Sequence, residues 1–442
     1  MIDVKLNDAE KRMLQGEDGL VPQLTMQWLV EMCQVAGTDT IIDLDGTGDF
    51  HTPWTTMTFH HEISLDELKK LTAAGGVFKI PTFSNKSPFT EMSPIHGWEG
   101  CDMCSRSHGN GRFDDCDFHE KSMHEEFYVE FRKMGMLQTH SCASYLTASY
   151  LPTIGQHCSW NESSAIPYCN AVLGARSNID GSFATCFLGK APYYDMHVTE
   201  NRLATVLVET ERLIHTDTEW DLLGFAIGED CGLAVPAITG TAKPTTTQFC
   251  KMNAGMNTGG SIRMYHIPGS TPEAPTLDAA FGGKKPQRTA LIGENVLRAT
   301  YEKLNFHTSD DVDMVYLGCP HLNAVDMMLL ARKLEGKKVK IPLWIMTAPW
   351  LYNVAKEQGY LKIFEDAGAK LMDGTCMAAM GGVPDYVHNI AVDSAKQSYY
   401  ITGCYPDDDN RLQVCYGTQD DCVDAALSGK WRGEFKSVGG AF

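Results

Sequence analysis

The sequence predicts a multi-domain α/β protein with parallel-rich sheets, and three observations support this prediction. The chain has 442 residues, 43% of them hydrophobic and 21% charged, which is enough for two or three domains with large cores. Beyond about residue 301, short apolar runs alternate with helical stretches, the pattern of βαβ units with right-handed crossovers. Small and polar residues dominate 139–192, a texture typical of an active-site region of turns and helix starts.

An N-terminal α/β region is expected over residues 1–203. A helix is predicted at 6–36, with Asn7 as its cap and Glu10 three positions later. Further along the region we expect a strand at 40–44, a helix at 64–73 closed by two glycines, a strand at 77–81 and a helix at about 125–134. Residues 84–120 are rich in Gly, Ser, Asp, His and Cys without hydrophobic periodicity, which indicates a loop-like insertion.

A middle α/β domain is expected at 204–300 and a C-terminal one at 301–442. In the middle domain we expect buried strands at 204–208, 224–228 and 233–238, with the Gly-, Pro- and Lys-rich stretch 268–288 as the best linker candidate. In the C-terminal domain we expect strands at 314–317, 343–346 and 370–372, and helices at 324–334, 351–358 and 363–367. Ligands of such sheets bind beyond the carboxyl ends of the strands. Cys319 and Cys376 both follow strands, so their thiols are expected to face one crevice.

Charge and cysteine content limit the partners and the compartment. A formal net charge of −19 repels phosphate backbones and anionic lipid, so we expect no nucleic acid partner and no membrane partner. No apolar run approaches the roughly 20 residues of a membrane span, and residues 1–10 lack an export signal, so we expect a cytoplasmic protein. Fifteen cysteines then indicate buried thiols, metal ligands or catalytic groups rather than a disulfide framework.

A series of motifs resembles the aconitase X branch of the aconitase superfamily. They read THSCASYL at 139–146, GQH at 155–157, WNESSA at 160–165, NAVLGARSN at 170–178, ENR at 200–202, GCPH at 318–321, TCM at 375–377 and DSAK at 393–396. Taken in this order the motifs are specific, and the resemblance spans nearly the whole chain. The chain departs from the family pattern at Ala143 and Ser144, where a Thr-Pro pair is usual, at Val392 and Asp393, where a Thr-Asn pair is usual, and in its longer 84–120 insertion.

The resemblance implies an aconitase-like fold and a hydro-lyase that dehydrates a small hydroxy acid. Its active site would lie where the α/β domains meet a smaller swivelling domain, which we expect this chain to lack and a small subunit to supply. Expelling hydroxide calls for a Lewis acid, and soft thiolates are suitable ligands for a mononuclear iron or an iron–sulfur cluster. Cys142, Cys319 and Cys376 are the implied ligands, and Glu162 is an alternative oxygen ligand; buried thiols in an ordinary core are the competing interpretation.

Other site candidates follow from the same motifs. Arg176 offers a fork for a substrate carboxylate, and Lys396 offers either a second positive charge or a base, the other candidate base being a serine of the small subunit. The remaining candidates are Ser163 and Ser394 as hydrogen-bond donors, His321 as a group that orients a ligand or binds substrate, and, more weakly, Asn85, His157, Asn201 and Arg202. The structural alternatives are a salt bridge for Arg176, a solvated Lys396 and a buried, satisfied His321.

The insertion carries a separate metal-binding pattern. Cys101 and Cys104 form one pair, and Cys116 and His119 form another, within one short polar stretch. Two such pairs are typical of a structural zinc site that orders a segment with little core of its own. The alternative is a loop without metal.

Two substrates fit the resemblance. We favour cis-3-hydroxy-L-proline, dehydrated to Δ1-pyrroline-2-carboxylate, because of the ending around Cys422 and because no obvious basic cluster for a phosphate is present. The alternative is (R)-5-phosphomevalonate, dehydrated to trans-anhydromevalonate 5-phosphate. A further alternative is a metal-sensing or RNA-regulatory protein without turnover, although the acidic charge argues against RNA.

Overall fold

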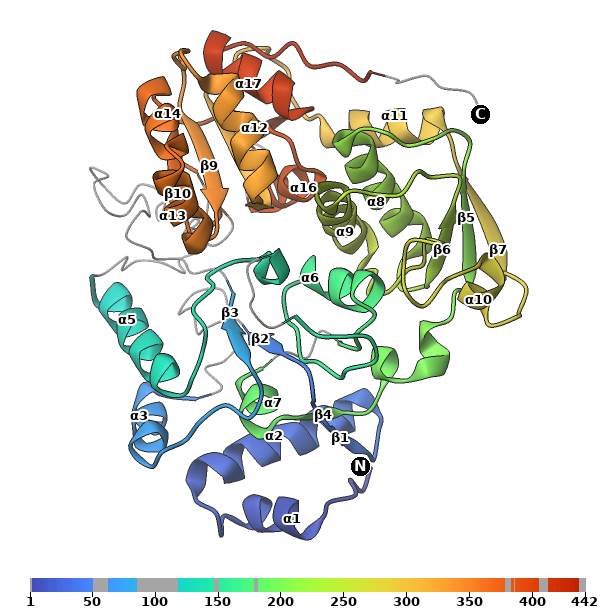
Figure 1. Cartoon of the computed structure of the whole chain (residues 1–442), viewed down its shortest axis with the longest axis vertical. Helices are drawn as coiled ribbons and strands as arrows, with labels where there is room; N and C mark the ends of the chain where they lie inside the picture. Colours follow the sequence, from blue (N-terminus) through green and yellow to red (C-terminus); the bar gives the residue numbers. More distant parts are fainter. Residues whose placement is uncertain are drawn as a thin grey trace.

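The computed structural model describes residues 2–50, 63–85, 118–146, 151–178, 182–377, 383–384, 386–404 and 412–436. Figure 1 shows three α/β regions in chain order, with the first at the bottom, the second at the right and the third at the upper left. The zinc candidates Cys101, Cys104 and Cys116 lie outside the described residues, as does the side chain of His119. No helix in the described part of the chain is long and apolar enough to cross a membrane.

The first region combines short helices with two small sheets. Strand β1 (Ile41–Asp43) pairs antiparallel with β4 (Lys190–Pro192), and β2 (Gly48–Phe50) pairs parallel with β3 (Thr82–Ser84). The helices are α1 (Asp8–Gln15), α2 (Leu20–Ala36), α3 (Leu65–Ala73), α5 (Phe118–Lys133), α6 (Ala165–Pro167) and α7 (Phe183–Leu188). The side chains of Asn7 and Ser64 cap α1 and α3 in capping boxes, so the predicted helix starts are confirmed there.

Two predictions for the first region are wrong. The single helix expected at 6–36 is two helices, because Gly16 adopts a left-handed conformation with φ of 81° and closes α1. The strand expected at 77–81 is absent, and strand pairing starts at Thr82 instead. Pro81 has no N–H to give to a ladder, which places the start of pairing after it.

The second region is a three-stranded parallel sheet covered by helices. Its strand order is β6-β5-β7, with β5 at Val206–Thr210, β6 at Pro236–Thr239 and β7 at Arg288–Ile292. Its helices are α8 (Asp217–Cys231), α9 (Thr246–Gly260), α10 (Leu277–Phe281) and α11 (Glu294–Leu304). Thr216 and Glu219 form a capping box that starts α8.

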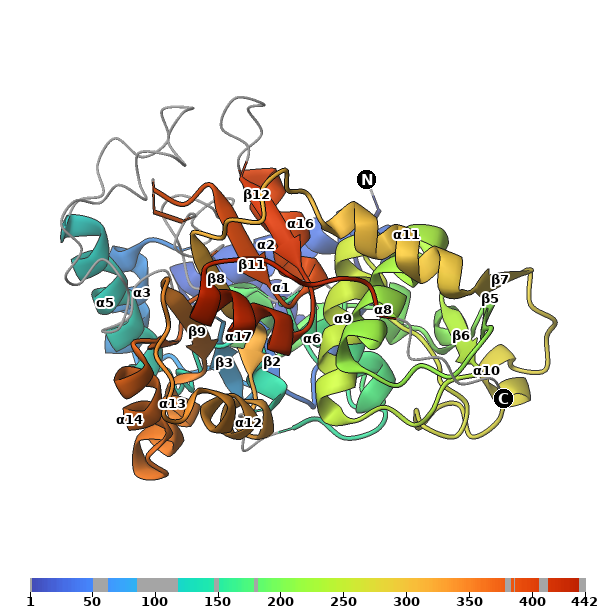
Figure 2. The same ribbon diagram turned by 90° about the horizontal axis from the view of Figure 1, so that it is seen from above.

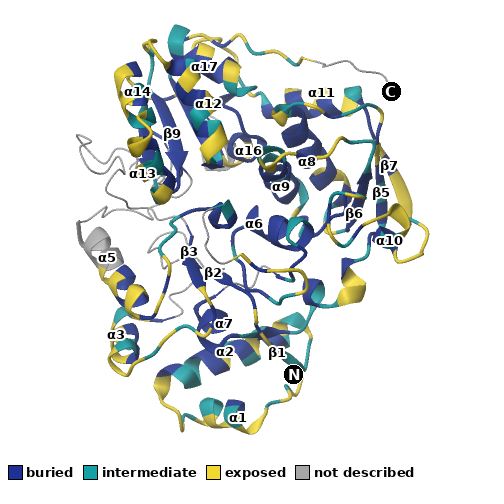
Figure 3. Ribbon diagram, in the orientation of Figure 1, coloured by how far each residue is buried: buried dark blue, intermediate teal, exposed yellow. Residues whose placement is uncertain are grey.

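The strand expected at 224–228 and the linker expected at 268–288 are both corrected. Residues 224–228 lie inside α8, which is buried over most of its circumference and so lacks the polar face that gives a helix its periodicity. Figure 3 shows α8 and α9 as the most uniformly buried helices of the second region. The 268–288 stretch contains α10 and buries Ala274, Ala280 and Phe281, so it packs as part of the second region.

The third region is a five-stranded parallel sheet with helices on both faces, as the alternation in the sequence predicted. The strand order is β10-β9-β8-β11-β12, at Lys370–Asp373, Leu343–Thr347, Met314–Leu322, Asn389–Val392 and Gln413–Tyr416. The helices are α12 (Ala324–Leu334), α13 (Pro349–Glu357), α14 (Tyr360–Ala367), α16 (Ala395–Cys404) and α17 (Gln419–Ser428). The α/β fold class with parallel sheets is thereby confirmed.

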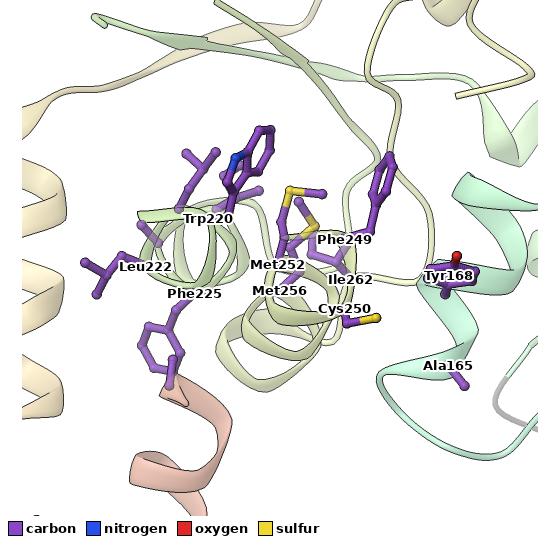
Figure 4. Close-up of a cluster of buried hydrophobic side chains, with 14 of the residues drawn as sticks. Ala165, Tyr168, Trp220, Leu222, Phe225, Phe249, Cys250, Met252, Met256 and Ile262 are labelled. Atoms are coloured by element: carbon purple, nitrogen blue, oxygen red, sulfur yellow. The ribbon is translucent and has the colours of Figure 1, made fainter. Parts of the chain in front are cut away.

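A continuous core joins the second and third regions and places the candidate site between them and the first. Viewed from above, α16 lies between the third-region sheet and the α8/α9 pair (Figure 2). Figure 4 shows Phe225 pointing from α8 toward α16, and Met252 and Met256 on α9 among the same buried side chains. From the other side, Tyr168 beyond α6 packs against Phe249 of α9 with ring centroids 6.5 Å apart. The first region therefore contacts the shared core through the segment that follows Glu162.

Candidate active site

The three predicted cysteine ligands come close together from three segments. Cys142 and Cys376 are buried, and Cys319 is partly exposed in the distorted end of β8. Burial raises the pKa of Cys319; nearby Lys396 works against the rise, and Cys142, Cys376 and Glu162 add to it. Burial also raises the pKa of Tyr316, and the neighbouring charges that add to that rise are again Cys376, Cys319 and Cys142. The thiols thus share one buried neighbourhood.

His321 connects the segments that carry these cysteines. Its backbone N–H donates to the Cys142 sulfur at 3.4 Å, its Nδ1 lies 3.1 Å from Ser141 Oγ, and its Nε2 lies 2.7 Å from the Thr375 carbonyl oxygen. Because a carbonyl only accepts, we assign the ring proton to Nε2, so that Nδ1 accepts from the Ser141 hydroxyl. One buried side chain therefore ties the residues before Cys142 and Cys376 to the segment of Cys319.

A buried ion pair between Lys396 and Glu162 lies beside the thiols. Lys396 Nζ donates to Glu162 Oε1 at 2.8 Å and to Ser163 Oγ at 2.9 Å, and the two charged side chains are only 9% and 2% exposed. The other carboxylate oxygen accepts the backbone N–H groups of Ser164 and Ala165 at 2.7 and 3.0 Å, at the start of α6. Burial works to lower the pKa of Lys396, but the nearby Glu162, Cys319, Tyr400 and Cys142 together outweigh it, and the pKa is raised. Lys396 is therefore held as a cation.

The structure gives Ser394 a local role at the start of α16. Its side chain is buried and its Oγ accepts the backbone N–H of Gln397 at 3.3 Å.

Asn85 is buried beside the segment that leads to Cys142, with its backbone hydrogen-bonded to His140. Thr375 Oγ1 is buried and has no hydrogen-bond partner among the described residues. Thr375 Oγ1 is thus a polar atom beside the thiols that bonds to none of the described residues.

Four further candidates gather away from the thiols, around residues 195–202. Arg176 donates to the His197 carbonyl and to Thr199 Oγ1, both at 2.9 Å. Arg202 is 1% exposed and pairs with Glu273. His157 Nδ1 lies 2.9 Å from His197 Nδ1, and exposed Asn201 donates to the Asp195 carbonyl at 3.2 Å. Arg176 thus bonds the segment around His197 and Thr199, and Arg202 pairs with Glu273; the roles predicted for both toward a substrate stay predictions.

Ser141, Thr375 and Tyr316 belong to the site neighbourhood but were not predicted. The Tyr316 hydroxyl accepts the Met377 N–H at 3.2 Å, which anchors the residue after Cys376 to β8. Ser141 and Thr375 each directly precede a predicted cysteine ligand. Their positions beside the ligands were the available signal, whereas Tyr316 is a strand residue with no local mark.

The donor set fits an iron centre in its chemistry. Three thiols and a carboxylate share one buried neighbourhood, and thiolates are the ligands that iron and iron–sulfur clusters favour. Within the described ranges, no three or more His, Cys, Asp and Glu side chains form a group that holds an ion as they stand. The residues therefore match an iron centre in the type of their donor atoms and in their nearness to one another.

A cavity is lined by the Cys319 segment, including Cys319 and His321 themselves. It has a volume of about 370 Å³ and lies between the starts of α8, α9, α12 and α17. Its wall includes residues 318–323, which span the end of β8, together with Cys250, Lys251 and Asp393. The cavity therefore lies at the carboxyl ends of β8, β11 and β12, where the third region faces the starts of α8 and α9.

Family models match along almost the whole chain. The description "Aconitase X first domain" matches residues 3–200, the second domain matches 204–302 and the third domain matches 312–428. The chain belongs to the aconitase X family. A phosphomevalonate dehydratase large subunit of Thermococcus kodakarensis is 30% identical over 402 residues, which cover 90% of this chain and 94% of that relative. As a member of a family whose relatives are named dehydratases, the chain is a hydro-lyase.

Other relatives in the aconitase X family carry a different substrate in their names. A cis-3-hydroxy-L-proline dehydratase of Pseudomonas aeruginosa is 33% identical over 307 residues, which cover 67% of this chain and 52% of that relative. The solved structure of the holo-form of Thermococcus kodakaraensis aconitase X superposes with a TM-score of 0.76 at 27% identity, and the match covers 96% of this chain and all of that one. The family and its dehydratase chemistry are common to these relatives, and the substrate differs between them.

Proposed function

We propose that the chain is the catalytic large subunit of an iron-dependent dehydratase acting on a small hydroxy acid. The observation that carries the proposal is the convergence of Cys142, Cys319 and Cys376 on one buried neighbourhood, with His321 bonded to all three segments. Cys142, Cys319 and Cys376 would hold the iron centre, and Glu162 is the alternative oxygen ligand, whose charge acts on Cys319. When bound, such a centre supplies the Lewis acidity that stabilises the departing hydroxide.

The protein's own residues divide the remaining work. Lys396 presents a fixed positive charge for a substrate carboxylate, since it is held as a cation between Glu162 and Ser163. A base must be unprotonated before it accepts a proton, so this arrangement favours a base from outside Lys396. The second candidate base is a serine of the small subunit, whose hydroxyl would itself have to be deprotonated before it accepts a proton. Burial of the site excludes water and strengthens these electrostatic contacts.

We propose cis-3-hydroxy-L-proline as the substrate. Lys396 is the cation among the groups whose charges act most strongly on Cys319, and one such cation suits a single carboxylate. A phosphate group is usually bound by several Arg or Lys side chains or by a dedicated backbone loop. A compact amino acid with one carboxylate therefore matches this neighbourhood.

The second candidate substrate is (R)-5-phosphomevalonate. It is favoured by the T. kodakarensis phosphomevalonate dehydratase large subunit, which matches 90% of this chain against 67% for the Pseudomonas proline enzyme. Lys251, Lys333 and Lys436 on the wall of the 370 Å³ cavity are further cations close to Cys319, although each also has a carboxylate partner. Assays with both substrates decide between them.

The first test is anaerobic analysis of iron and sulfide, with electron paramagnetic resonance, on wild type and on Cys142→Ser, Cys319→Ser and Cys376→Ser. Each substitution is expected to abolish or strongly reduce the bound iron. Cys33→Ser is the matched control, because Cys33 is also a buried thiol but lies in α2 of the first region. Reconstituted wild type without iron, or three serine variants that keep all of it, would rule out this centre.

A further inference from the structure

One buried carboxylate outside the candidate site reaches the helix that carries Lys396. Asp221, on α8, is fully buried, and its Oδ2 accepts the Ala395 N–H at 2.6 Å and the Tyr416 hydroxyl at 2.9 Å. Its other oxygen, Oδ1, has no hydrogen-bond partner among the described residues. The acid comes from the second region, and the helix it contacts belongs to the third.

Ala395 is the first residue of α16, where a cap from elsewhere in the fold is effective. The first four N–H groups of a helix have no partner within the helix. Ser394 satisfies one of them, that of Gln397, and Asp221 satisfies that of Ala395. A carboxylate at this end also suits the positive end of the helix dipole.

The two helices lie side by side over a full turn. Four residues beyond Asp221, Phe225 packs against Tyr399, which is four residues beyond Ala395, with ring centroids 5.8 Å apart. Residues four apart lie on one helix face, so a single face of α8 supports a single face of α16. The contact through Asp221 is therefore part of a defined packing geometry.

A second contact fixes the turn just before α16. Lys251 of α9 donates to the Asp393 carbonyl at 2.6 Å and to its carboxylate at 3.1 Å. The 393–395 turn is thus held by a base from α9 and an acid from α8. Lys396 follows directly, and its ammonium group must reach Glu162 and Ser163 in the first region.

We propose that Asp221 is a positioning residue for the candidate active site: by capping α16 it fixes the backbone of Lys396, so that the ammonium group meets Glu162 and Ser163. The position of a long, flexible side chain depends on the position of its backbone. Small displacements of such a group at an active site strongly reduce activity. The importance of Lys396 rests on the proposed function; its placement by Asp221 does not.

The chemistry of Asp221 supports a role beyond packing. Burial raises its pKa to about 7, although Lys251, the Ala395 amide and the Tyr416 hydroxyl all work in the opposite direction. A buried acid is costly to stability, and well-packed apolar residues often serve a core equally well. An apolar residue at this position would have no acceptor for the Ala395 N–H, whereas Asp221 has one.

A matched pair of variants tests the proposal. Asp221→Leu keeps the branched shape and the number of heavy atoms but has no acceptor, whereas Asp221→Asn keeps a carbonyl oxygen for the Ala395 N–H. The readouts are hydrogen exchange of the first turn of α16 and the rate at which an amine-acylating reagent labels Lys396, followed by mass spectrometry. We expect both rates to rise about tenfold in the Leu variant, because local opening becomes easier, and to stay near wild type in the Asn variant.

Tyr416→Phe is the control, since it removes the other donor to the same oxygen and leaves the cap. It is expected to resemble wild type in both readouts. If Asp221→Leu does not fold, the double variant Asp221→Leu with Tyr416→Phe replaces it, because that variant leaves no unsatisfied hydroxyl. Unchanged exchange and labelling in the Leu background would overturn the proposal, as would an equal effect in Asp221→Asn.

The rate of turnover provides an independent test. With whichever substrate is dehydrated, we expect Asp221→Leu to lower kcat by about 10- to 100-fold and Asp221→Asn to restore most of it. Full activity in a Leu variant whose Lys396 is exposed to the reagent would contradict the role of Lys396 in the proposed function, while leaving its placement by Asp221 supported. If wild type dehydrates neither substrate, the proposed function fails, while exchange and labelling still decide whether Asp221 positions Lys396.

Discussion

Single residues at the candidate site work by joining segments that are distant in the chain. His321 bonds Ser141, Cys142 and Thr375, so its ring and its backbone are used together. Groups behind metal ligands orient them, and their loss typically costs about 10- to 100-fold in metal affinity. His321 is therefore expected to act through the cysteines rather than on the substrate.

His321→Phe is predicted to weaken iron retention by about 10- to 100-fold while the chain stays folded, because the ring volume is kept and both polar links are lost. A competition assay with an iron chelator measures the change. His266→Phe is the control, since His266 is also buried and bonds a backbone carbonyl, that of Arg202, at 2.7 Å. Equal iron retention in the two variants would contradict a role for His321 at the metal centre.

The ion pair of Glu162 and Lys396 should show coupled energetics. Removing one partner leaves a buried charge without compensation, so Glu162→Gln and Lys396→Met are each predicted to lower the free energy of unfolding by about 3–5 kcal/mol. The double variant should lose less than the sum of the two but regain no turnover. Urea denaturation of the four proteins measures the cycle, and strictly additive losses would show that the pair does not interact.

The exposed pair Lys362 and Asp366 on α14 is the control and should show little coupling.

At the scale of elements, α8 and α9 owe their close packing to glycine. A Cβ placed on Gly224 of α8 would lie 2.3 Å from the Met252 carbonyl oxygen of α9, and one on Gly255 of α9 would lie 2.7 Å from the Asp221 carbonyl oxygen. Both contacts are with backbone atoms, which cannot move away as the end of a flexible side chain can. These two helices carry Asp221 and Lys251, so their spacing also sets the contacts with α16.

Gly224→Ala is predicted to destabilise the chain by about 1–3 kcal/mol through overpacking, although alanine is the better helix former. Thermal and urea unfolding measure the loss, and hydrogen exchange at the start of α16 should rise with it. An Ala variant as stable as wild type would mean that the helices separate without cost. Gly255→Ala, on the facing helix, should give a loss of similar size.

At the scale of the whole molecule, the three α/β regions meet around the thiols, and several relatives are named large subunits. We predict that the purified chain binds iron but turns over slowly or not at all until a small subunit is added. Co-expression followed by light scattering and a dehydration assay measures both association and turnover. Full activity of the chain alone would contradict a requirement for the second subunit.

Local and periodic features of the sequence determined much of the fold. The alternation after residue 301 predicted the parallel sheet, and Asn7 with Glu10 predicted a helix start, because strand period and capping act within a few residues. The segment 224–228 was misassigned because a helix buried on nearly all sides carries no periodic signal. The motifs likewise indicated the family and its dehydratase chemistry.

Tertiary structure alone decided which of the candidate residues meet. In the sequence, Arg176 and Lys396 were both candidates for binding a substrate carboxylate. In the structure, Arg176 hydrogen-bonds to His197 and Thr199, whereas Lys396 pairs with Glu162, 234 positions away. The Asp221 cap on Ala395 spans 174 positions in the same way. Such pairings depend on how helices and sheets pack, because burial and partner choice belong to the folded chain as a whole and leave no mark on neighbouring residues.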